Sequence, residues 1–297
     1  MRCSIALVAA LWLAFGAGPR AAEEGLRLLP FQLQGDGDIV VPVTIDGGGP
    51  FDFLLDTGSS RTIVSDATAR RLGLQIVAQT LMVTPLGEAP QALAPLNRVA
   101  MGAGPPATVL AMIVPADALD RGRDIDGIIG QDILARRSYT IDYERRHLAW
   151  HSASTGELGG ARLPLELREG RLLVSLPQRQ KDRTVWPFAS PLPVGATTLH
   201  FIPDSGADGF VLFARPGRAL PAVSALDTAG LRTLSGHRAV RRVVIDALDV
   251  GDIRLRNQTA LIVDGSDAAL GDGLLPLHLF ARVTFNGPQR LLIVEAR

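Results

Sequence analysis

The sequence contains an internal repeat, and this repeat constrains the fold more than any other feature of the chain. Residues 53–66 (FLLDTGSSRTIVSD) match 201–214 (FIPDSGADGFVLFA), and residues 126–134 (DGIIGQDIL) match 272–280 (DGLLPLHLF). The first two segments lie 148 residues apart and the second two lie 146 residues apart, so both landmarks recur in the same order at nearly the same spacing. We therefore expect two similar halves of roughly 130 residues each.

Each half has the pattern of a β domain. Residues 38–47 and 51–56 predict a hairpin that turns at Gly47–Pro50. Residues 139–151 and 283–296 each predict a further hairpin, at the same place in the two halves. The 20 prolines and 31 glycines are spread along the chain, as expected for many short strands joined by tight turns.

Three other segments have clear local signals. Residues 241–264 predict further strands. Residues Ser65–Leu72 predict a helix, because Ser65 is a suitable N-cap and Gly73 a suitable stop. Small residues dominate 152–160, which we expect to link the two halves.

The N-terminus predicts a signal peptide, residues 1–21. Arg2 supplies a positive charge, and the 14 residues 4–17 carry none, which is too short for a membrane span of about 20 apolar residues. Small residues follow, so we expect cleavage after Gly18 or Ala21. The protein is then periplasmic or secreted, with no stable membrane span; the alternative is a protein tethered by the uncleaved segment.

Composition excludes several classes of function. The 30 basic and 30 acidic residues balance, and no segment forms a basic patch, so we expect no nucleic-acid partner. The only cysteine, Cys3, lies in the predicted signal peptide. The mature chain therefore has no cysteine nucleophile, thiolate metal site or disulfide.

Histidines and other acidic residues do not predict a metal site. His147 and His151 lie in a segment with strand alternation, and no acidic residue has the spacing of a third ligand. Asp126, Asp132 and Asp272 lack the spacing of a calcium loop, and we expect them to cap turns. We expect neither metal nor cofactor.

The repeat places an acid after an apolar segment in each half. Gly58 and Gly206 follow two residues after Asp56 and Asp204, where they allow a sharp turn whose N–H groups donate to the carboxylate. If the halves pack around a pseudo-twofold axis, Asp56 and Asp204 face each other. Two carboxylates in contact do not both ionise, so the pair shares one proton. One member then accepts a proton from water while the other donates one to a carbonyl oxygen.

These residues resemble the aspartic peptidases, the pepsin and retropepsin group. The resemblance covers essentially all of 28–297, in two copies, and is carried by Asp56-Thr57-Gly58-Ser59, Asp204-Ser205-Gly206-Ala207 and Ile128-Ile129-Gly130. It implies an all-β fold of two pseudo-symmetric β-barrel-like lobes, residues 28–151 and 161–297.

The resemblance also implies a role for each residue of the two turns. Asp56 and Asp204 form the catalytic pair, and the residues that support it are Thr57, Gly58, Ser59, Ser205, Gly206 and Ala207. Thr57 and Ser205 cross-link the two loops by hydroxyl-to-backbone hydrogen bonds. Ser59 donates its hydroxyl to the outer oxygen of Asp56; Asp204 lacks this bond, so we expect Asp56 to carry more of the pair's negative charge.

Two further turns predict flaps that close over a bound peptide. Pro85-Leu86-Gly87 lies 31 residues after Asp56, and Ser235-Gly236-His237 lies 32 residues after Asp204. The flap candidates are Leu86, Gly87, Gly236 and His237. Two flaps make the chain similar to a fused retropepsin-type dimer, a monomer with an intramolecular pseudo-dimer; the alternative is two ordinary hairpins.

The second half departs from the family pattern. Pro203 precedes Asp204, and because proline has no N–H we expect altered strand pairing there. Pro276 stands where the first half has Gly130. The leading hypothesis is an exported aspartic endopeptidase that cleaves extended peptide or protein substrates. The alternatives are a module of the same fold that binds peptides or a partner without cleaving them, and a domain of an envelope complex.

Overall fold

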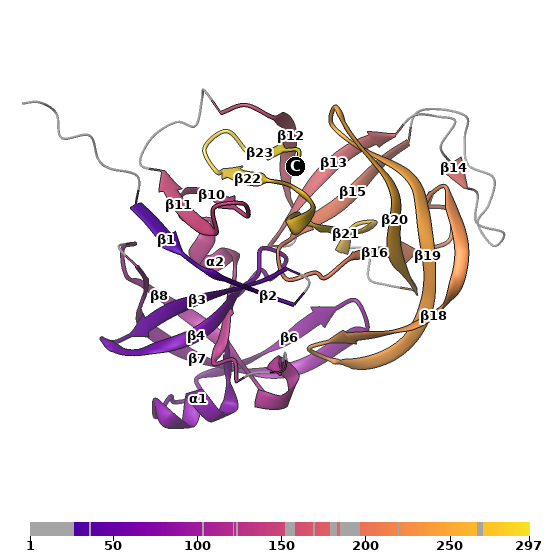
Figure 1. Ribbon diagram of the computed structural model, residues 1–297. Helices are drawn as coiled ribbons and strands as arrows, with labels where there is room; N and C mark the ends of the chain where they lie inside the picture. Colours follow the sequence, from indigo (N-terminus) through magenta and orange to yellow (C-terminus); the bar gives the residue numbers. More distant parts are fainter. Residues whose placement is uncertain are drawn as a thin grey trace, which may run out of the picture.

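The computed structural model describes most of the chain after the predicted signal peptide, and nearly all of its regular structure is β (Figure 1). The described residues are 27–35, 37–102, 104–120, 122, 124–151, 158–168, 170–178, 183–184, 197–218, 220–265 and 270–297. The predicted signal peptide lies outside them, as does most of the predicted linker.

The first lobe is an eight-stranded sheet with three short helices. In spatial order its strands are β2 (Gln32–Gln34), β3 (Asp38–Ile45), β4 (Gly48–Leu55), β9 (Gly127–Ile129), β5 (Ile63–Ser65), β8 (Ala107–Val114), β7 (Gly87–Met101) and β6 (Ala78–Thr84). The helices are α1 (Asp66–Arg71), the 3₁₀ helix η1 (Ala116–Leu119) and α2 (Gln131–Leu134).

A sheet of 13 strands contains the second lobe and the junction between the lobes. The junction strands are β1 (Arg27–Pro30), β11 (His147–His151), β10 (Ser138–Asp142), β22 (Arg282–Asn286), β23 (Leu291–Glu295) and β12 (Ala161–Arg168). The second lobe continues with β13 (Arg171–Gln178), β15 (Thr197–Asp204), β21 (Gly273–Pro276), β16 (Phe210–Ala214), β20 (Ile253–Asp264), β19 (Gly236–Val250) and β18 (Val223–Thr233). The short strands β14 (Arg183–Thr184) and β17 (Leu220–Pro221) pair with each other, and the 3₁₀ helix η3 covers Leu277–Leu279.

The two lobes have the same strand order, which confirms the predicted all-β, two-lobed fold. From β3 to β6 the first lobe runs β3-β4-β9-β5-β8-β7-β6, and the second lobe runs β13-β15-β21-β16-β20-β19-β18. In both lobes the strand that leads to the repeated acid pairs in parallel with the strand of the second landmark, β4 with β9 and β15 with β21. The sequence repeat is therefore a repeat of topology.

The lobes meet at the pair β10–β22. These strands are antiparallel, and Thr140 lies opposite Thr284, with their hydroxyls 2.6 Å apart. Tyr139 of β10 stacks on Phe285 of β22, with ring centroids 4.8 Å apart. The junction is therefore a continuous sheet with an aromatic contact across it.

The local predictions for hairpins and for the helix are confirmed. Strands β3 and β4 pair, although their turn is Asp46–Gly47 rather than Gly47–Pro50. Strands β10–β11 and β22–β23 pair as hairpins where the sequence predicts them, and β19 and β20, in the segment expected to form further strands, also pair. Helix α1 begins after Ser65, whose hydroxyl accepts a hydrogen bond from the Thr68 N–H at 3.0 Å.

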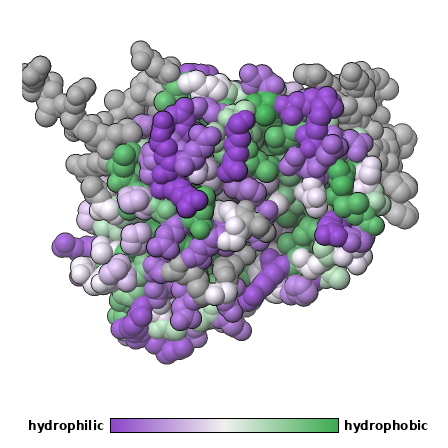
Figure 2. Space-filling view, viewed as in Figure 1, coloured by the Kyte–Doolittle hydropathy of each residue, from purple (hydrophilic) through white to green (hydrophobic). Residues whose placement is uncertain are grey.

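The hydrophobic core divides into three clusters. The largest runs from Leu29 to Val294 and includes side chains from both lobes and from the junction. A second cluster lies within the first lobe and a third within the second lobe. On the face drawn in Figure 2, hydrophobic residues occur in small groups among hydrophilic ones. Within the part of the chain that the structure describes, no helix has the length and apolar character needed to span a membrane.

Candidate active site

Asp56 lies directly after β4, at the edge of the first lobe that faces the second. Its N–H donates to the Ile129 carbonyl oxygen at 3.0 Å, which continues the parallel ladder with β9. Its Oδ1 accepts hydrogen bonds from the N–H groups of Gly58 (2.8 Å) and Ser59 (2.9 Å). The turn thus fixes the orientation of this carboxylate.

Asp204 occupies the same position in the second lobe. It is the last residue of β15 and pairs with Pro276 of β21. Its Oδ1 accepts a hydrogen bond from the Gly206 N–H at 2.8 Å. Asp204 is buried, although it lines the cavity between the lobes.

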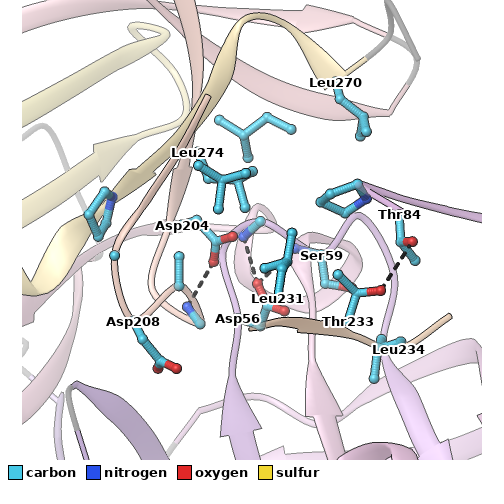
Figure 3. Close-up of a pocket in the computed structure, with 18 of the residues that line it drawn as sticks. Asp56, Ser59, Thr84, Asp204, Asp208, Leu231, Thr233, Leu234, Leu270 and Leu274 are labelled. Atoms are coloured by element: carbon cyan, nitrogen blue, oxygen red, sulfur yellow. Dashed lines mark hydrogen bonds between the residues drawn. The ribbon is translucent and has the colours of Figure 1, made fainter. Parts of the chain in front are cut away.

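The two carboxylates face each other, and each packs against the glycine of the opposite loop. A Cβ atom at Gly58 would lie 2.6 Å from Asp204 Cγ, and one at Gly206 would lie 3.1 Å from Asp56 Cγ. In Figure 3 the side chains of Asp56 and Asp204 lie together at the centre of the pocket. The fold therefore brings together the two acids that the repeat identifies.

Thr57 and Ser205 cross-link the two loops, as the family resemblance implies. The Thr57 hydroxyl donates to the Pro203 carbonyl oxygen (2.8 Å) and accepts from the Ser205 N–H (3.0 Å). The Ser205 hydroxyl donates to the Leu55 carbonyl oxygen (2.7 Å) and accepts from the Thr57 N–H (3.0 Å). Both side chains are buried, so these four bonds are shielded from water and hold the two acids in register.

Ser59 does not have the contact expected of it. Its hydroxyl donates to the Arg61 carbonyl oxygen at 2.8 Å, and it is the Ser59 backbone N–H that reaches Asp56. The expectation that this hydroxyl makes Asp56 the more negative member of the pair therefore has no structural basis. Ala207, the counterpart of Ser59, lines the cavity.

The two prolines of the second lobe do not interrupt its strands. The β15–β21 ladder includes the pairs Pro203↔Leu275 and Asp204↔Pro276, so pairing with β21 is intact. Pairing with β13 ends at Phe201, one position earlier than in the first lobe, where Val40 pairs with Leu54. In a parallel ladder alternate residues direct their N–H groups to the same neighbour. In the first lobe the N–H of the acid, Asp56, donates to Ile129 at the end of β9. In the second lobe Pro203 stands one residue before the acid, Asp204. The missing N–H therefore faces away from β21.

Pro276 and Gly130 occupy equivalent positions in the two lobes, each before a short helix. Gly130 immediately precedes α2, and Pro276 immediately precedes η3. Gly130 packs against the Arg61 backbone, where a Cβ would lie 2.5 Å from the carbonyl carbon. The second-lobe counterpart of Arg61 is Gly209, at the corresponding position of the loop after Asp204.

A hairpin from each lobe, β6–β7 and β18–β19, extends toward the other in Figure 1. Residues of both hairpins line the cavity. Strands β6 and β7 turn at Pro85-Leu86, and strands β18 and β19 turn at Leu234-Ser235. The Thr84 hydroxyl makes a short hydrogen bond with the Ser235 hydroxyl and lies 3.4 Å from the Thr233 hydroxyl. The tips of the two hairpins are therefore in contact with each other.

Each hairpin tip packs on the opposite lobe. Leu86, from the first lobe, contacts the second-lobe cluster that contains Leu173, Ile202 and Val211. Leu234, from the second lobe, contacts the first-lobe cluster that contains Leu54 and Ile128. The Arg232 guanidinium also crosses between the lobes and donates to the Asp117 carbonyl oxygen.

The four flap candidates differ in position. Leu86 lies at the tip, and Gly87 and Gly236 follow the two turns with φ of +133° and +144°, values that favour glycine. His237 is exposed and lies against Gly230 on the neighbouring strand, outside the lining of the cavity. Sequence reasoning missed Thr84 and Thr233, which the repeated pattern Thr-x-x-Gly at 84–87 and 233–236 would have identified.

The space between the loops and the hairpins is a cavity of about 940 Å³. Apolar side chains line it around the acids, among them Ile202, Leu231 and Leu274. In Figure 3 Leu270 and Leu274 lie on one side of the acids and Thr84, Thr233 and Leu234 on another. The cavity is large enough to hold several residues of a peptide.

Asp126 and Asp272 support the strands that carry the two acids, rather than capping turns. Asp126 accepts the Asp52 N–H at 3.0 Å, and Asp272 accepts the His200 N–H at 2.9 Å; both donors lie four residues before a repeated acid. Asp126 also pairs with Arg71 at 2.6 Å. Asp272 is buried and pairs with two guanidinium groups, those of Arg215 (3.1 Å) and Arg218 (2.5 Å).

Opposing effects act on the pKa of Asp272. Burial favours the neutral acid, but hydrogen bonds from Arg218 and the His200 N–H, together with the charges of Arg218 and Arg215, outweigh it. The result is a pKa below the usual value for aspartate. Tyr143, also buried, has a raised pKa because of desolvation and the nearby charge of Asp204.

Both halves of the chain are similar in sequence to a known protein family. The model of a family described as aspartyl protease matches residues 41–133 and 191–278, so the match is divided between the two halves. No curated protein sequence matches the chain significantly.

The solved structures that match the chain include two plant seed proteins and a protein from Rickettsia conorii. Basic 7S globulin from soybean is 13% identical with a TM-score of 0.48, over 91% of this chain and 94% of that one. Conglutin gamma, a basic 7S globulin from lupine seeds, is 13% identical with a TM-score of 0.47, over 92% and 95% of the two chains. A retropepsin-like aspartic protease from Rickettsia conorii is 20% identical with a TM-score of 0.31, over 42% of this chain and 90% of that one.

Proposed function

Because this chain belongs to the aspartyl protease family, we propose that it is an endopeptidase in which Asp56 and Asp204 activate water to hydrolyse peptide bonds. The observation that carries the proposal is the contact of each carboxylate with the glycine of the opposite loop. Two carboxyl groups held in this way share one proton, which gives the site both a base and an acid.

The reaction follows from that arrangement. A water molecule between the two groups loses a proton to the ionised carboxylate as it attacks the peptide carbonyl carbon. The protonated carboxyl group donates its proton to the carbonyl oxygen, which leaves a neutral tetrahedral intermediate. The carboxyl group that took the water proton donates it to the peptide nitrogen, while the other carboxylate accepts a hydroxyl proton of the intermediate. The C–N bond breaks, and the pair again holds one proton. The residues of this chain suffice for each of these proton transfers.

The surrounding residues support this chemistry. The four hydrogen bonds between Thr57, Ser205 and the opposite backbones limit movement of the acids, and small displacements of reacting groups are costly in rate. The two hairpins over the cavity shield the reaction from bulk water when closed. An extended substrate would pair with their strands by β-augmentation.

The test is cleavage of a denatured protein and of a peptide library between about pH 3 and pH 8. We expect cleavage by the wild type, and a loss of at least about 1,000-fold in kcat for Asp56→Asn and for Asp204→Asn, because each variant lacks one member of the acid–base pair. Both variants should fold, as judged by circular dichroism. A folded wild type that cleaves nothing but retains peptides would instead be a binding module.

We also propose that the protein is exported, from the charge and apolar segment at its N-terminus. Mass spectrometry of protein from the producing cell should find a mature chain that begins after Gly18 or Ala21. An intact N-terminus in the membrane fraction would support the tethered form instead.

A further inference from the structure

The internal repeat makes it possible to compare the two ends of the cavity position by position. The fourth and fifth residues after Asp56 are Ser60 and Arg61, and those after Asp204 are Asp208 and Gly209. All four line the cavity. In Figure 3 Ser59, which precedes Ser60, and Asp208 lie on opposite sides of the two acids. At these two positions the first-lobe loop thus carries a cation, Arg61, whereas the second-lobe loop has Asp208 and a glycine.

A second pair of equivalent positions also has an arginine on one side, Arg171, and an acid on the other, Asp38. Val41 pairs with Phe53 in the first lobe, and Val174 pairs with Phe201 in the second. Because Phe53 and Phe201 are repeat equivalents, counting back along each strand makes Arg171 the counterpart of Asp38, and these residues begin β13 and β3.

Arg61 and Arg171 belong to the same end of the cavity. Arg171 lines the cavity, and a Cβ at the adjacent Gly170 would lie 4.0 Å from the Ser60 side chain. The turn before Arg171 therefore rests on the loop that carries Arg61. At the other end, the turn before Asp38 rests on the second lobe, with Gly37 against the His278 ring.

Both guanidinium groups contact a backbone carbonyl group. Arg171 Nη2 donates to the carbonyl oxygen of Val83, which lines the cavity, at 3.1 Å, and Arg61 Nη1 donates to that of Leu110, outside the cavity lining, at 3.4 Å. A guanidinium has five N–H donors, so the contact with Leu110 uses one of those of Arg61. The nearby Asp132 already accepts two bonds from Thr62, through its N–H (2.9 Å) and its hydroxyl (2.7 Å).

We propose that the end of the cavity formed by Arg61 and Arg171 binds a carboxylate side chain of the substrate. This inference rests on the proposed endopeptidase function: the enzyme would prefer peptides with Asp or Glu on one side of the scissile bond. Guanidinium groups bind carboxylates by charge-assisted, often bidentate hydrogen bonds. Arg232, a further arginine of the lining, is held by the Asp117 carbonyl oxygen, and Asp208 on the other side repels an acidic side chain, so we expect a one-sided preference.

The first experiment measures this preference directly. A fixed peptide carries Glu or Gln in turn at each position from the fourth residue before the scissile bond to the fourth after it. Glu should raise kcat/KM about tenfold over Gln at a position on one side, as expected for one partly exposed charge-assisted hydrogen bond. Equal rates for Glu and Gln at every position would overturn the inference and leave the proposed hydrolysis intact.

Variants at Arg61 identify the residue responsible. Arg61→Gln should lower the rate with the Glu peptide about tenfold more than the rate with the Gln peptide, and Arg61→Glu should favour Lys at the same position. Arg70→Gln, which removes an exposed arginine of α1 outside the cavity, is the matched control and should keep the wild-type ratio. A Glu preference that survives in Arg61→Glu would contradict the assignment.

The repeat also permits a gain of function. Asp208→Ser with Gly209→Arg gives the second loop the Ser-Arg pair of the first. A Cβ at Gly209 meets no atom within 4 Å, so the loop has room for a side chain. This double variant should acquire a second preference for Glu, on the opposite side of the scissile bond. Peptides that show no such second preference would count against recognition by this loop position.

Binding by an inactive variant separates the two proposals. Fluorescence anisotropy of labelled Glu and Gln peptides with Asp56→Asn measures recognition without hydrolysis. Tighter binding of the Glu peptide, abolished by adding Arg61→Gln, supports the inference even if the wild type cleaves nothing. Equal affinities of the two peptides for Asp56→Asn would refute it whatever the wild type cleaves.

Discussion

At the scale of single residues, the site depends on two glycines that have unequal room. Gly58 lies against the Asp204 carboxyl group so closely that a Cβ would come within 2.6 Å of Cγ, whereas a Cβ at Gly206 would remain 3.1 Å from Asp56 Cγ. The first distance is shorter than real Cβ contacts, and the second is tight. The two loops are therefore similar in sequence, but an added side chain fits better at Gly206 than at Gly58.

This difference predicts unequal effects of alanine at the two positions. Gly58→Ala should displace the acids and lower kcat by about 100-fold, a loss typical of a misplacement of about 1 Å. Gly206→Ala should lower kcat by only about tenfold, because a shift of a few tenths of an ångström relieves its contact. Peptide hydrolysis by both purified variants tests this, and equal losses would contradict the geometry.

A second residue-scale prediction concerns Asp272 and stability. Its folded pKa is lowered, so its contribution to stability is present above the unfolded value of about 3.9 and is lost as pH falls through the folded value. Asp272→Asn leaves two arginines without their buried partner and should cost about 3–5 kcal/mol at pH 7.

Urea unfolding at pH 7 and pH 3 measures the effect. The difference between wild type and Asp272→Asn should shrink at the lower pH, where the wild-type carboxyl group is becoming neutral. Asp227→Asn, which breaks an exposed pair with Arg242, is the control and should leave stability unchanged. A constant difference at both pH values would mean that the charge of Asp272 is not what stabilises the fold.

At the level of secondary-structure elements, the two hairpins over the cavity contact each other and the opposite lobes, so together they close it. Leu86 and Leu234 each pack on the lobe opposite to their own, and the Thr84 and Ser235 hydroxyls join the tips. Neither hairpin buries its tip on its own lobe. Opening one flap therefore removes contacts from both.

A disulfide between the tips tests this closure. Thr84→Cys with Ser235→Cys places two thiols where the two hydroxyls already form a hydrogen bond. Oxidation should lower kcat/KM for a protein substrate by at least about tenfold, because the tips then cannot separate to admit it, and reduction should restore it.

The chain makes this experiment simple. Its only natural cysteine is Cys3, in the predicted signal peptide, so no other thiol competes in the mature protein. Each single-cysteine variant is a control for the loss of one hydroxyl. An oxidised double variant with wild-type activity would show that substrate enters without separation of the tips.

At the level of the whole molecule, the two lobes are joined by the junction strands and by the largest of the three hydrophobic clusters. Thr140 pairs with Thr284 across the junction, Tyr139 stacks on Phe285, and the largest hydrophobic cluster includes residues of both lobes. A lobe separated from its partner would expose this surface. We expect the two lobes to unfold together.

Trp150 reports on this junction because its ring packs edge-on against Tyr139, with centroids 5.8 Å apart. The other two tryptophans are Trp12, in the predicted signal peptide, and Trp186. In the mature chain with Trp186→Phe, the fluorescence of Trp150 and the far-ultraviolet circular dichroism should change at the same denaturant concentration, as in a two-state transition. Two separate transitions would indicate that one lobe persists after the junction has opened.

Local pattern and internal repetition were sufficient to predict several parts of this protein. Alternating apolar residues and turn residues predicted the β hairpins, Ser65 predicted the start of α1, and the repeat predicted two lobes with an acid in each. These features were predictable because strand alternation and helix caps act over a few residues. The repeated segments have the same pattern, and they fold into the same strand order.

Tertiary structure alone decided which distant atoms meet. The Ser59 hydroxyl turned to Arg61 rather than to Asp56, the proline at Pro203 proved harmless to the β15–β21 ladder, and the hairpin tips crossed to the opposite lobes. Each outcome depends on the direction of a donor or side chain relative to a partner brought close by folding. A local pattern places a residue on a strand or in a turn, but the packing of the two lobes determines which group lies opposite it.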